Sequence, residues 1–285
     1  VKYKRDEILA KHTTFRIGGP AQYWVEPRDV AQLAELMCWC KKNRMRVRVI
    51  GAGSNILAAD QGVRGIVVRL SASYFTSIRS INRLCLAGAG ALLSSLIAYC
   101  TQQGLSGVEF LTGIPGTVGG ALAGNAGTKD KSIGDLVEFV IVMDYNGDIR
   151  KRSAADLDFS YRRSNLGDCV VLQACLKLVK KDKTKIRSSI VRYVDARRRS
   201  QGKGWFSAGC CFKNPAGDSA GRLIDACGLK GARSGNAVVS EAHANFILND
   251  GNAKASDVLA LMRRIKAKVK KRFGARLEPE IKIWR

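Results

Sequence analysis

The feature that most constrains the fold of this chain is a glycine-dense segment in its first half. Six glycines lie between residues 113 and 127, in the order Gly-Ile-Pro-Gly-Thr-Val-Gly-Gly-Ala-Leu-Ala-Gly-Asn-Ala-Gly. Glycine loses more conformational entropy on folding than any other residue, so this density is unfavourable unless the backbone must lie closely against something. Two hypotheses follow: the loop packs on its own domain, or its backbone amides hold a ligand.

A shorter glycine loop precedes this segment. Residues 51–55 read Gly-Ala-Gly-Ser-Asn and directly follow an apolar run, 47–50, that is typical of a strand. The amides of such a loop could converge on a phosphate, with donors added by Ser54 and Asn55. Alone the motif is weak, because it is not Gly-x-Gly-x-x-Gly and a plain tight turn has the same composition. Two such loops in one domain favour a long dinucleotide cofactor held by backbone amides.

The spacing of apolar residues and the length of 285 residues together predict two α+β domains. Strands alternate with helices in the first half, and a charged stretch at 180–185 predicts the junction. The elements expected before it are helices at 30–40 and 92–100, strands at 47–50, 65–70 and 169–179, and a hairpin turning at 146–148. Those expected after it are helices at 219–227 and 256–272 and strands at 237–239, 246–248 and 281–284. We therefore expect domains over residues 1–183 and 184–285.

The net charge of +24, from 48 Lys and Arg against 24 Asp and Glu, raises a nucleic-acid hypothesis. However, the excess is spread over both halves, and no helix-turn-helix, zinc-finger or aromatic RNP pattern occurs. The densest basic run, 263–272, lies on a predicted amphipathic helix, so a solvated basic face is the simpler interpretation. The alternative predicts salt-dependent retention on DNA. We expect no nucleic-acid partner.

The cysteines and the hydropathy pattern indicate an intracellular protein without a metal site. Most of the nine cysteines lie in apolar segments, as buried free thiols do, and no Cys-x-x-Cys pair occurs. With only two histidines, a structural zinc site has few ligands to use, so we expect no metal. No apolar run reaches the roughly 18 residues that cross a bilayer, and residues 1–6 are unlike a signal peptide. We therefore expect a cytoplasmic protein that does not bind membranes.

Six motifs in a fixed order carry a resemblance to a known family. They read Thr-Phe-Arg-Ile-Gly-Gly-Pro at 14–20, the two glycine loops at 51–55 and 113–120, Tyr-Arg-Arg-Ser at 161–164, Gly-Cys-Cys-Phe-Lys-Asn-Pro at 209–215, and Leu-Glu-Pro-Glu-Ile at 277–281. In this order they closely resemble the UDP-N-acetylenolpyruvoylglucosamine reductases (MurB). The alternative is another FAD-dependent oxidase or dehydrogenase of the same superfamily, which would not be expected to share the last three motifs.

The resemblance implies a fold and an activity. The fold would be α+β, with an FAD-binding domain of the vanillyl-alcohol-oxidase (PCMH) type followed by a smaller α+β substrate-binding domain. The protein would be an oxidoreductase that uses NADPH to convert UDP-N-acetylglucosamine enolpyruvate into UDP-N-acetylmuramate, a cytoplasmic step of peptidoglycan synthesis that serves cell-wall biogenesis, cell shape and cell division. FAD would bind non-covalently, because no histidine stands near the glycine loops. We expect a monomer of the short, type II form, because Arg162 and Cys210 are too close in sequence for the longer form's insertion.

The resemblance also assigns roles to individual residues. The predicted FAD contacts are Gly51, Gly53, Ser54 and Asn55 in the first loop and Gly113, Ile114, Pro115, Gly116, Gly119, Gly120 and Asn125 in the second. The predicted substrate contacts are Lys213, Asn214, His243 and Asn245. The predicted catalytic residues are Arg162, Cys210 and Glu280. Without the motifs, Arg162 and Glu280 would be interpreted as ordinary paired or exposed charges.

Position 210 departs from the family, which normally has serine there as the acid that protonates an enolate. A thiol, with a reference pKa of about 8.5, is a far stronger acid than a serine hydroxyl, so proton donation remains feasible. Successive side chains alternate along a strand, and Cys211 should therefore point elsewhere. The alternative is that Cys210 only fills space while another group supplies the proton.

Overall fold

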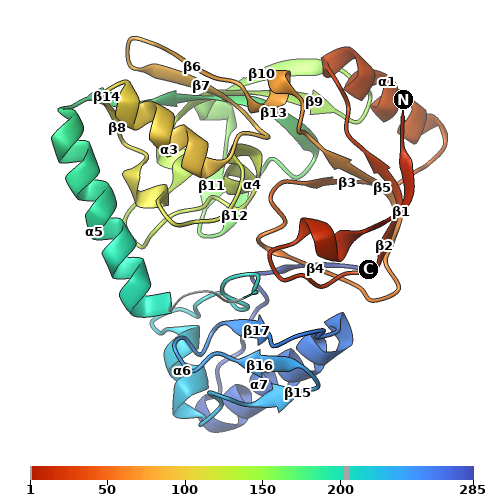
Figure 1. Ribbon diagram of the computed structural model, residues 1–285, viewed down its shortest axis with the longest axis vertical. Coiled ribbons are helices and arrows are strands. Elements are labelled where there is room, and N and C mark those ends of the chain that lie inside the picture. The colour runs from red at the N-terminus through yellow and green to blue at the C-terminus, as the bar shows by residue number, and fades with distance from the viewer. Residues whose placement is uncertain (1, 202–205) are drawn as a thin grey trace. The chain divides into compact units, whose positions relative to one another are not determined.

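The computed structural model describes residues 2–201 and 206–285 of the chain (Figure 1). These residues form two compact units, each assembled from separate stretches of sequence. Unit 1 comprises Val1–Lys4, Tyr23–Ala52 and Gly65–Arg197, and unit 2 comprises Arg5–Gln22, Gly53–Arg64 and Arg198–Arg285. The two units are described separately.

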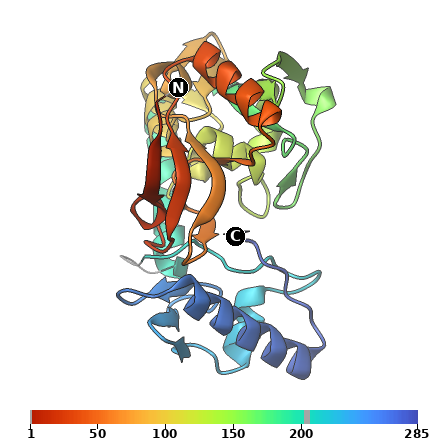
Figure 2. The same ribbon diagram turned by 90° about the vertical axis from the view of Figure 1, so that its right-hand side faces the viewer.

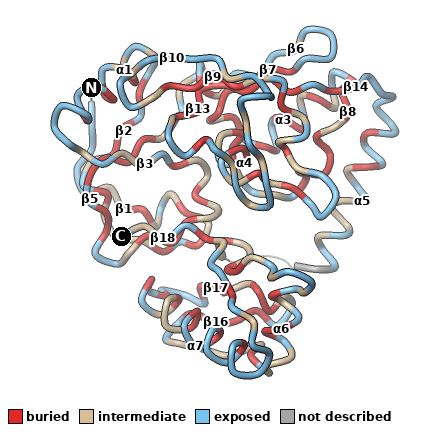
Figure 3. Tube along the Cα trace, turned by 180° about the vertical axis from the view of Figure 1, so that it is seen from behind, coloured by how far each residue is buried: buried red, intermediate tan, exposed pale blue. Residues whose placement is uncertain are grey.

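Unit 1 is built on a five-stranded antiparallel sheet with the strand order β10-β9-β13-β7-β6. The strands are β6 (Ile78–Ile81), β7 (Leu84–Gly88), β9 (Val137–Asp144), β10 (Ile149–Ser153) and β13 (Cys169–Lys177). Seven consecutive residues of β13 are buried, which explains its almost continuous apolar sequence. Figure 3 shows how the buried residues follow these central strands. The hairpin predicted at 146–148 joins β9 to β10, and Gly147 supplies the positive φ of its turn.

Helices complete the core of unit 1. Helix α1 (Val30–Lys42) begins as predicted, since the carboxylate of Asp29 accepts the N–H of Gln32 at 2.8 Å. Helices α3 (Leu93–Gln102) and α4 (Val118–Ala123) place their apolar residues in the same core as the sheet. Smaller elements are α2 (Ser73–Thr76), β8 (Leu105–Ser106), β11 (Phe159–Ser160), β12 (Arg163–Ser164), β14 (Val179–Lys180), η2 (Glu109–Leu111), η3 (Ile133–Leu136) and η4 (Ala154–Asp156).

Helix α5 (Lys183–Gln201) was not predicted. The charged stretch that we interpreted as a domain junction is the point at which this helix begins. Ile186 is buried, and Ile190 and Tyr193 pack against the core at helical spacing, whereas most other positions are exposed and many are basic. Because the apolar stripe of α5 is so narrow, the many charged residues around it hide the helical spacing of its apolar residues in the sequence.

Unit 2 has a three-stranded antiparallel sheet, β15-β16-β17, packed against α7 (Figures 1 and 2). The elements are α6 (Ala220–Ala226), β15 (Arg233–Ser234), β16 (Ala237–Val239), β17 (Ile247–Asn249), α7 (Ala255–Phe273) and β18 (Lys282–Trp284). Strand β18 pairs in parallel with β4 (Ile56–Ala58). Helix α7 buries an apolar face and ends at Gly274, which has the left-handed φ of +69° that favours glycine.

A further sheet has the order β1-β2-β5-β3, formed by β1 (Lys4–Ile8), β2 (Pro20–Val25), β3 (Val47–Ile50) and β5 (Val63–Arg69); η1 (Leu9–His12) follows β1. Strands β3 and β5 are parallel and lie where strands were expected.

The two units do not coincide with the expected domains over 1–183 and 184–285. Helix α5 falls in unit 1 as far as Arg197, and segments 5–22 and 53–64 fall in unit 2. Long-range contacts explain the second difference, because Asn249 donates its side-chain N–H to the carbonyl of Phe15 at 3.0 Å and β4 pairs with β18. Compact units defined by spatial contacts need not coincide with domains that are continuous in sequence. The expected domain ranges, 1–183 and 184–285, therefore stay a prediction.

Asp60, in the loop between β4 and β5, caps the first turn of α7. Its carboxylate accepts the backbone N–H of Ala255 at 2.6 Å and of Ser256 at 3.0 Å. Partial burial alone would raise the pKa of this carboxyl, but the donors of Ser256 and Ala255 and the charge of Lys254 bring it below its ordinary value of 3.8. The ionised carboxylate is therefore the form that stabilises the fold.

We expect Asp60→Ala to lower the free energy of unfolding by about 1 kcal/mol at neutral pH, the usual effect of losing a helix cap. Because the folded pKa lies below the unfolded one, this stabilisation is fully present above the unfolded pKa and is lost as pH falls through the folded pKa. Urea unfolding near pH 7 and near pH 2.5 measures the penalty, which should shrink in acid. Asp60→Asn keeps an acceptor but cannot titrate, and serves as the control. An equal alanine penalty at both pH values would contradict the assignment.

Candidate active site

The first glycine loop, 51–55, is held tightly by the protein itself. A Cβ atom on Gly51 would lie 2.4 Å from Oγ1 of Thr117, within unit 1. Within unit 2, a Cβ on Gly53 would lie 2.0 Å from the carbonyl oxygen of His12, and its φ of +64° also favours glycine. Packing on the chain thus accounts for these two glycines. Their contact with a phosphate stays a prediction, as do the roles of Ser54 and Asn55.

The second glycine loop is partly helical. Thr117 caps α4, its Oγ1 accepting the N–H of Gly120 at 3.3 Å, so Gly119 and Gly120 lie in the first turn. A Cβ on Gly119 would lie 2.9 Å from the Cβ of Ala89, which again explains glycine by packing. Ahead of the helix, Gly113 and Pro115 are exposed and Ile114 and Gly116 are half-buried.

Gly120, in α4, and Gly124, which caps its C-terminal end, are not explained by packing. A Cβ on Gly120 would come no closer than 3.4 Å to the atoms around it, and one on Gly124 no closer than 3.7 Å. These residues lie one helical turn apart and therefore share a face. Backbone without a side chain, where an added Cβ would meet the protein only at ordinary van der Waals distance, allows a flat or anionic cofactor group to approach closely. The second loop therefore fits the predicted cofactor on this face.

Arg162 stands at the tip of a tight hairpin in unit 1. Strands β11 and β12 pair in the register Ser160↔Arg163, which leaves Tyr161 and Arg162 as a two-residue turn. Arg162 has a φ of +57°. Residues other than glycine and asparagine adopt this left-handed backbone conformation at some energetic cost. It is half-buried, and its guanidinium carbon lies 5.5 Å from the centre of the Tyr161 ring. A strained, half-buried cation of this kind is typical of a functional position.

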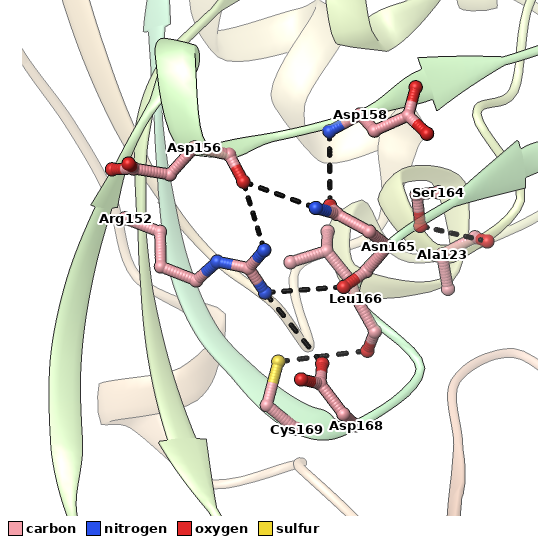
Figure 4. Close-up of polar contacts among 9 residues, drawn as sticks. All are labelled: Ala123, Arg152, Asp156, Asp158, Ser164, Asn165, Leu166, Asp168 and Cys169. Carbon is pink, nitrogen blue, oxygen red and sulfur yellow. Dashed lines mark hydrogen bonds and ion pairs between the residues drawn. The ribbon is translucent and has the colours of Figure 1, made fainter.

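Polar contacts hold this hairpin from outside (Figure 4). Arg152 donates to the carbonyl of Asn165 at 3.2 Å and to that of Asp156 at 2.9 Å. The Asn165 amide closes the same loop, donating to the Asp156 carbonyl and accepting the N–H of Asp158. Ser164 donates to the carbonyl of Ala123 at 3.2 Å. These bonds fix the residues on either side of the Tyr161–Arg162 turn. No sequence pattern predicted them.

In unit 2, residues 210–213 form the middle of a three-segment ribbon. On one side Cys210 pairs with Phe246, and the N–H of Cys211 donates to the carbonyl of Asn245 at 2.8 Å. On the other side Phe212 pairs with Pro279, and the N–H of Glu280 donates to the carbonyl of Cys211 at 2.8 Å. Cys210 and Glu280, 70 positions apart in sequence, are thus brought onto adjacent segments.

The two neighbouring cysteines have different environments. Cys211 is fully buried, and burial raises the pKa of its thiol to about 12, with further raising by the nearby Cys210 and Glu280 and an opposing contact from the backbone of Ile247. Cys210 is half-buried. The two cysteines therefore differ in burial, and Cys210 is the more exposed of the two.

Asn55 and Asn245 both hold this ribbon. The amide of Asn55 donates to the carbonyl of Glu280 at 3.3 Å. Asn245 is 2% exposed, and its amide both donates to the carbonyl of Phe212 at 2.7 Å and accepts the N–H of Phe212 at 3.0 Å. Sequence reasoning missed this structural role, and the predicted substrate contact of Asn245 stays a prediction.

The other predicted substrate residues also have partners within unit 2. Lys213 pairs with Glu278 at 3.5 Å, and Asn214 accepts the N–H of Ala220 at 3.0 Å ahead of α6. Burial lowers the pKa of His243, helped by the charge of Lys230, so its imidazole is held neutral, and it accepts the N–H of Asn245 at 3.2 Å. These contacts position the side chains and do not test substrate binding.

Neither a metal-binding cluster nor a membrane-spanning helix is found among the described residues. No group of three or more His, Cys, Asp or Glu side chains within residues 2–201 and 206–285 is placed to hold a metal ion. Over the same residues, no helix combines the length and apolar character that crossing a membrane requires.

Comparison with known proteins gives consistent matches along the chain. A family model for an FAD binding domain matches residues 21–153, and one for the C-terminal domain of UDP-N-acetylenolpyruvoylglucosamine reductase matches residues 201–284. The reductase of that name from Desulfosudis oleivorans is 42% identical over 99% of this chain and 94% of its own length. One from Symbiobacterium thermophilum is 40% identical over 99% and 92%. The crystal structure of the Thermus caldophilus enzyme (MurB) matches with a TM-score of 0.87 and 38% identity, covering 100% of this chain and 99% of that chain.

Proposed function

Because the chain belongs to the UDP-N-acetylenolpyruvoylglucosamine reductase family, we propose that it reduces UDP-N-acetylglucosamine enolpyruvate to UDP-N-acetylmuramate, with FAD as cofactor and NADPH as reductant. The observation that carries this conclusion is the agreement with reductases of that family along the whole chain, in sequence and in fold. The predicted fold class is confirmed: an FAD-binding domain of the vanillyl-alcohol-oxidase type precedes a smaller α+β domain. The enzyme is an oxidoreductase of peptidoglycan precursor synthesis.

Bound FAD would supply the redox chemistry, a hydride transfer that links NADPH to the enolpyruvyl double bond. The two glycine loops would hold it, with the bare face of Gly120 and Gly124 allowing the closest approach. Anchoring through backbone amides fits non-covalent binding.

The chain's own residues would manage charge and proton. Reduction places negative charge on the carbon beside the substrate carboxylate and on that carboxylate's oxygens. Arg162, a permanent cation on a fixed turn, would stabilise this charge. Cys210, which is half-buried, would donate the proton from its thiol, and Glu280 on the adjacent segment would share that proton.

Three finer assignments complete the proposal. The partners are small molecules, and we propose that the protein acts as a monomer, in the cytoplasm, as the short type II form. The spacing between the arginine motif and the Cys210 motif supports the type assignment. A cytoplasmic site fits an enzyme whose reductant is NADPH.

The test is an anaerobic reoxidation experiment. Purified protein should carry flavin, and NADPH should bleach its absorption near 450 nm. Adding UDP-N-acetylglucosamine enolpyruvate without oxygen should restore the absorption and yield one UDP-N-acetylmuramate per flavin. UDP-N-acetylglucosamine, which lacks the enolpyruvyl group, is the control and should restore nothing. A flavin reoxidised by oxygen or another acceptor but not by the enolpyruvyl substrate would instead indicate a different flavoprotein of the superfamily.

A further inference from the structure

The turn that carries Arg162 is tied to the second glycine loop at two points. Ser164, on β12, donates to the carbonyl of Ala123. Asn125 donates its side-chain N–H to the carbonyl of Ser160, the last residue of β11, at 3.0 Å. Both contacts join the hairpin to the C-terminal end of α4. The cofactor loop and the arginine turn therefore form one connected structure within unit 1.

Asn125 is the buried member of this connection. It is 7% exposed, and its side-chain oxygen also accepts the N–H of Gly134 at 3.1 Å. Its own φ is +42°, a conformation that asparagine tolerates better than most residues. A buried amide that bonds two backbone groups is difficult for water to replace. Asn125 thus links α4, η3 and β11 through a single side chain.

The backbone of Arg162 needs such support. Its left-handed φ in a two-residue turn is unfavourable for arginine, and strain of this kind persists only when the surrounding structure holds it. The contacts of Arg152 and Asn165 hold the outer side of the hairpin, but they are exposed to solvent. The bond from Asn125 to Ser160 acts two residues before Arg162 and is mostly buried.

We infer that Asn125 is a positioning residue for Arg162: its amide fixes the hairpin turn so that the guanidinium is held where negative charge develops on the substrate. This inference rests on the proposed function, which makes Arg162 a catalytic residue. Besides the predicted contact of Asn125 with the cofactor, this role depends on the two hydrogen bonds of its side chain. Displacing a catalytic group by about 1 Å can slow a reaction on the order of 100-fold.

The test is a double-mutant cycle on the holoenzyme. Asn125→Gly removes the amide and suits the positive φ, so it disturbs the backbone least. It should slow anaerobic flavin reoxidation by the enolpyruvyl substrate by about 10- to 100-fold, and by clearly more than it slows flavin reduction by NADPH. Added to Arg162→Ala, it should slow reoxidation by no more than about twofold further, because a residue that acts through Arg162 has nothing left to position.

A second readout is independent of turnover. Hydrogen exchange, followed by mass spectrometry, should be faster for the peptide covering 157–167 in Asn125→Gly. The matched control is Asn43→Gly, which removes a similar side-chain bond, from Nδ2 to the carbonyl of Trp39, at the end of α1. It should leave reoxidation and the exchange of that peptide unchanged. If Asn125→Gly does not fold, Asn125→Asp keeps the acceptor for Gly134 and replaces the donor to Ser160 with a carboxylate oxygen that repels its carbonyl, and it should show the same split between the half-reactions.

The possible failures are distinguishable. Equal penalties for Asn125→Gly in the wild-type and Arg162→Ala backgrounds would overturn the inference and leave the proposed function intact. Wild-type reoxidation in Asn125→Gly would do the same. Wild-type reoxidation in Arg162→Ala would remove Arg162 from the proposed mechanism, and the inference with it.

Discussion

Replacing Cys210 with alanine is expected to slow flavin reoxidation by the enolpyruvyl substrate by a factor on the order of 1000, within the range that general acids contribute. Cys210 is half-buried, and the segment that carries Glu280 is hydrogen-bonded to the neighbouring residue Cys211. Cys211 cannot substitute, because it is fully buried and its pKa is raised to about 12. Single-turnover absorbance near 450 nm measures the rate, and product analysis measures protonation.

The control for this prediction is Cys210→Ser, which restores the residue usual in the family. It should retain appreciable activity. Donation requires a neutral group, so wild-type reoxidation should decline in alkaline solution as the thiol ionises, and the decline should move to higher pH in Cys210→Ser. Complete reoxidation and product formation by Cys210→Ala would show that water or another group delivers the proton.

Glu280→Gln and Arg162→Lys are each expected to slow the same half-reaction by at least about 100-fold, since losing one stabiliser of a developing anion costs roughly 3 kcal/mol. Lysine keeps the charge of Arg162 but loses the planar, two-pronged donor geometry. Flavin reduction by NADPH should remain within about threefold of wild type. Stopped-flow measurement of the two half-reactions separates these effects.

Two surface variants make the same chemical changes elsewhere and serve as controls. Glu138→Gln and Arg150→Lys alter partly exposed side chains on the sheet of unit 1, in weak ion pairs with Lys177 and Asp144. Both should reduce and reoxidise at wild-type rates. Equal losses in the two half-reactions for Glu280→Gln or Arg162→Lys would indicate general misfolding or a role in NADPH binding.

Local signals in the sequence predicted local structure well. The cap at Asp29, the hairpin at Gly147 and the apolar spacing of α7 each depend on residues within a few positions of one another. Helix α5 was missed because its apolar stripe is narrow and its charges dominate the pattern. The glycine density was interpreted correctly as close backbone approach, but for Gly51, Gly53 and Gly119 the approaching atoms belong to the protein.

The arrangement of the candidate site depended on contacts that no local pattern contains. The amide of Asn245 bonds the backbone of a residue 33 positions away, and Asn125 bonds one 35 positions away. An asparagine in such a motif can either bind a ligand or hold the backbone, because its amide donor and acceptor suit both roles. The sequence alone therefore does not distinguish the two. The family resemblance named the residues, while the structure indicates which of them hold others in place.

Unit 2 is assembled from three separate segments of sequence, and this limits the order in which the chain can fold during synthesis. Strand β4 is synthesised well before its partner strand β18, and the first turn of α7, which Asp60 caps, also follows much later in the sequence. In a growing chain, β4 and the carboxylate of Asp60 therefore lack these partners until α7 and β18 have been synthesised. Closing so long a loop is slow and exposes apolar strands meanwhile. The folding of unit 2 should therefore limit the yield of folded enzyme. A chaperone should raise that yield, and removal of the residues that form β18 should lower it.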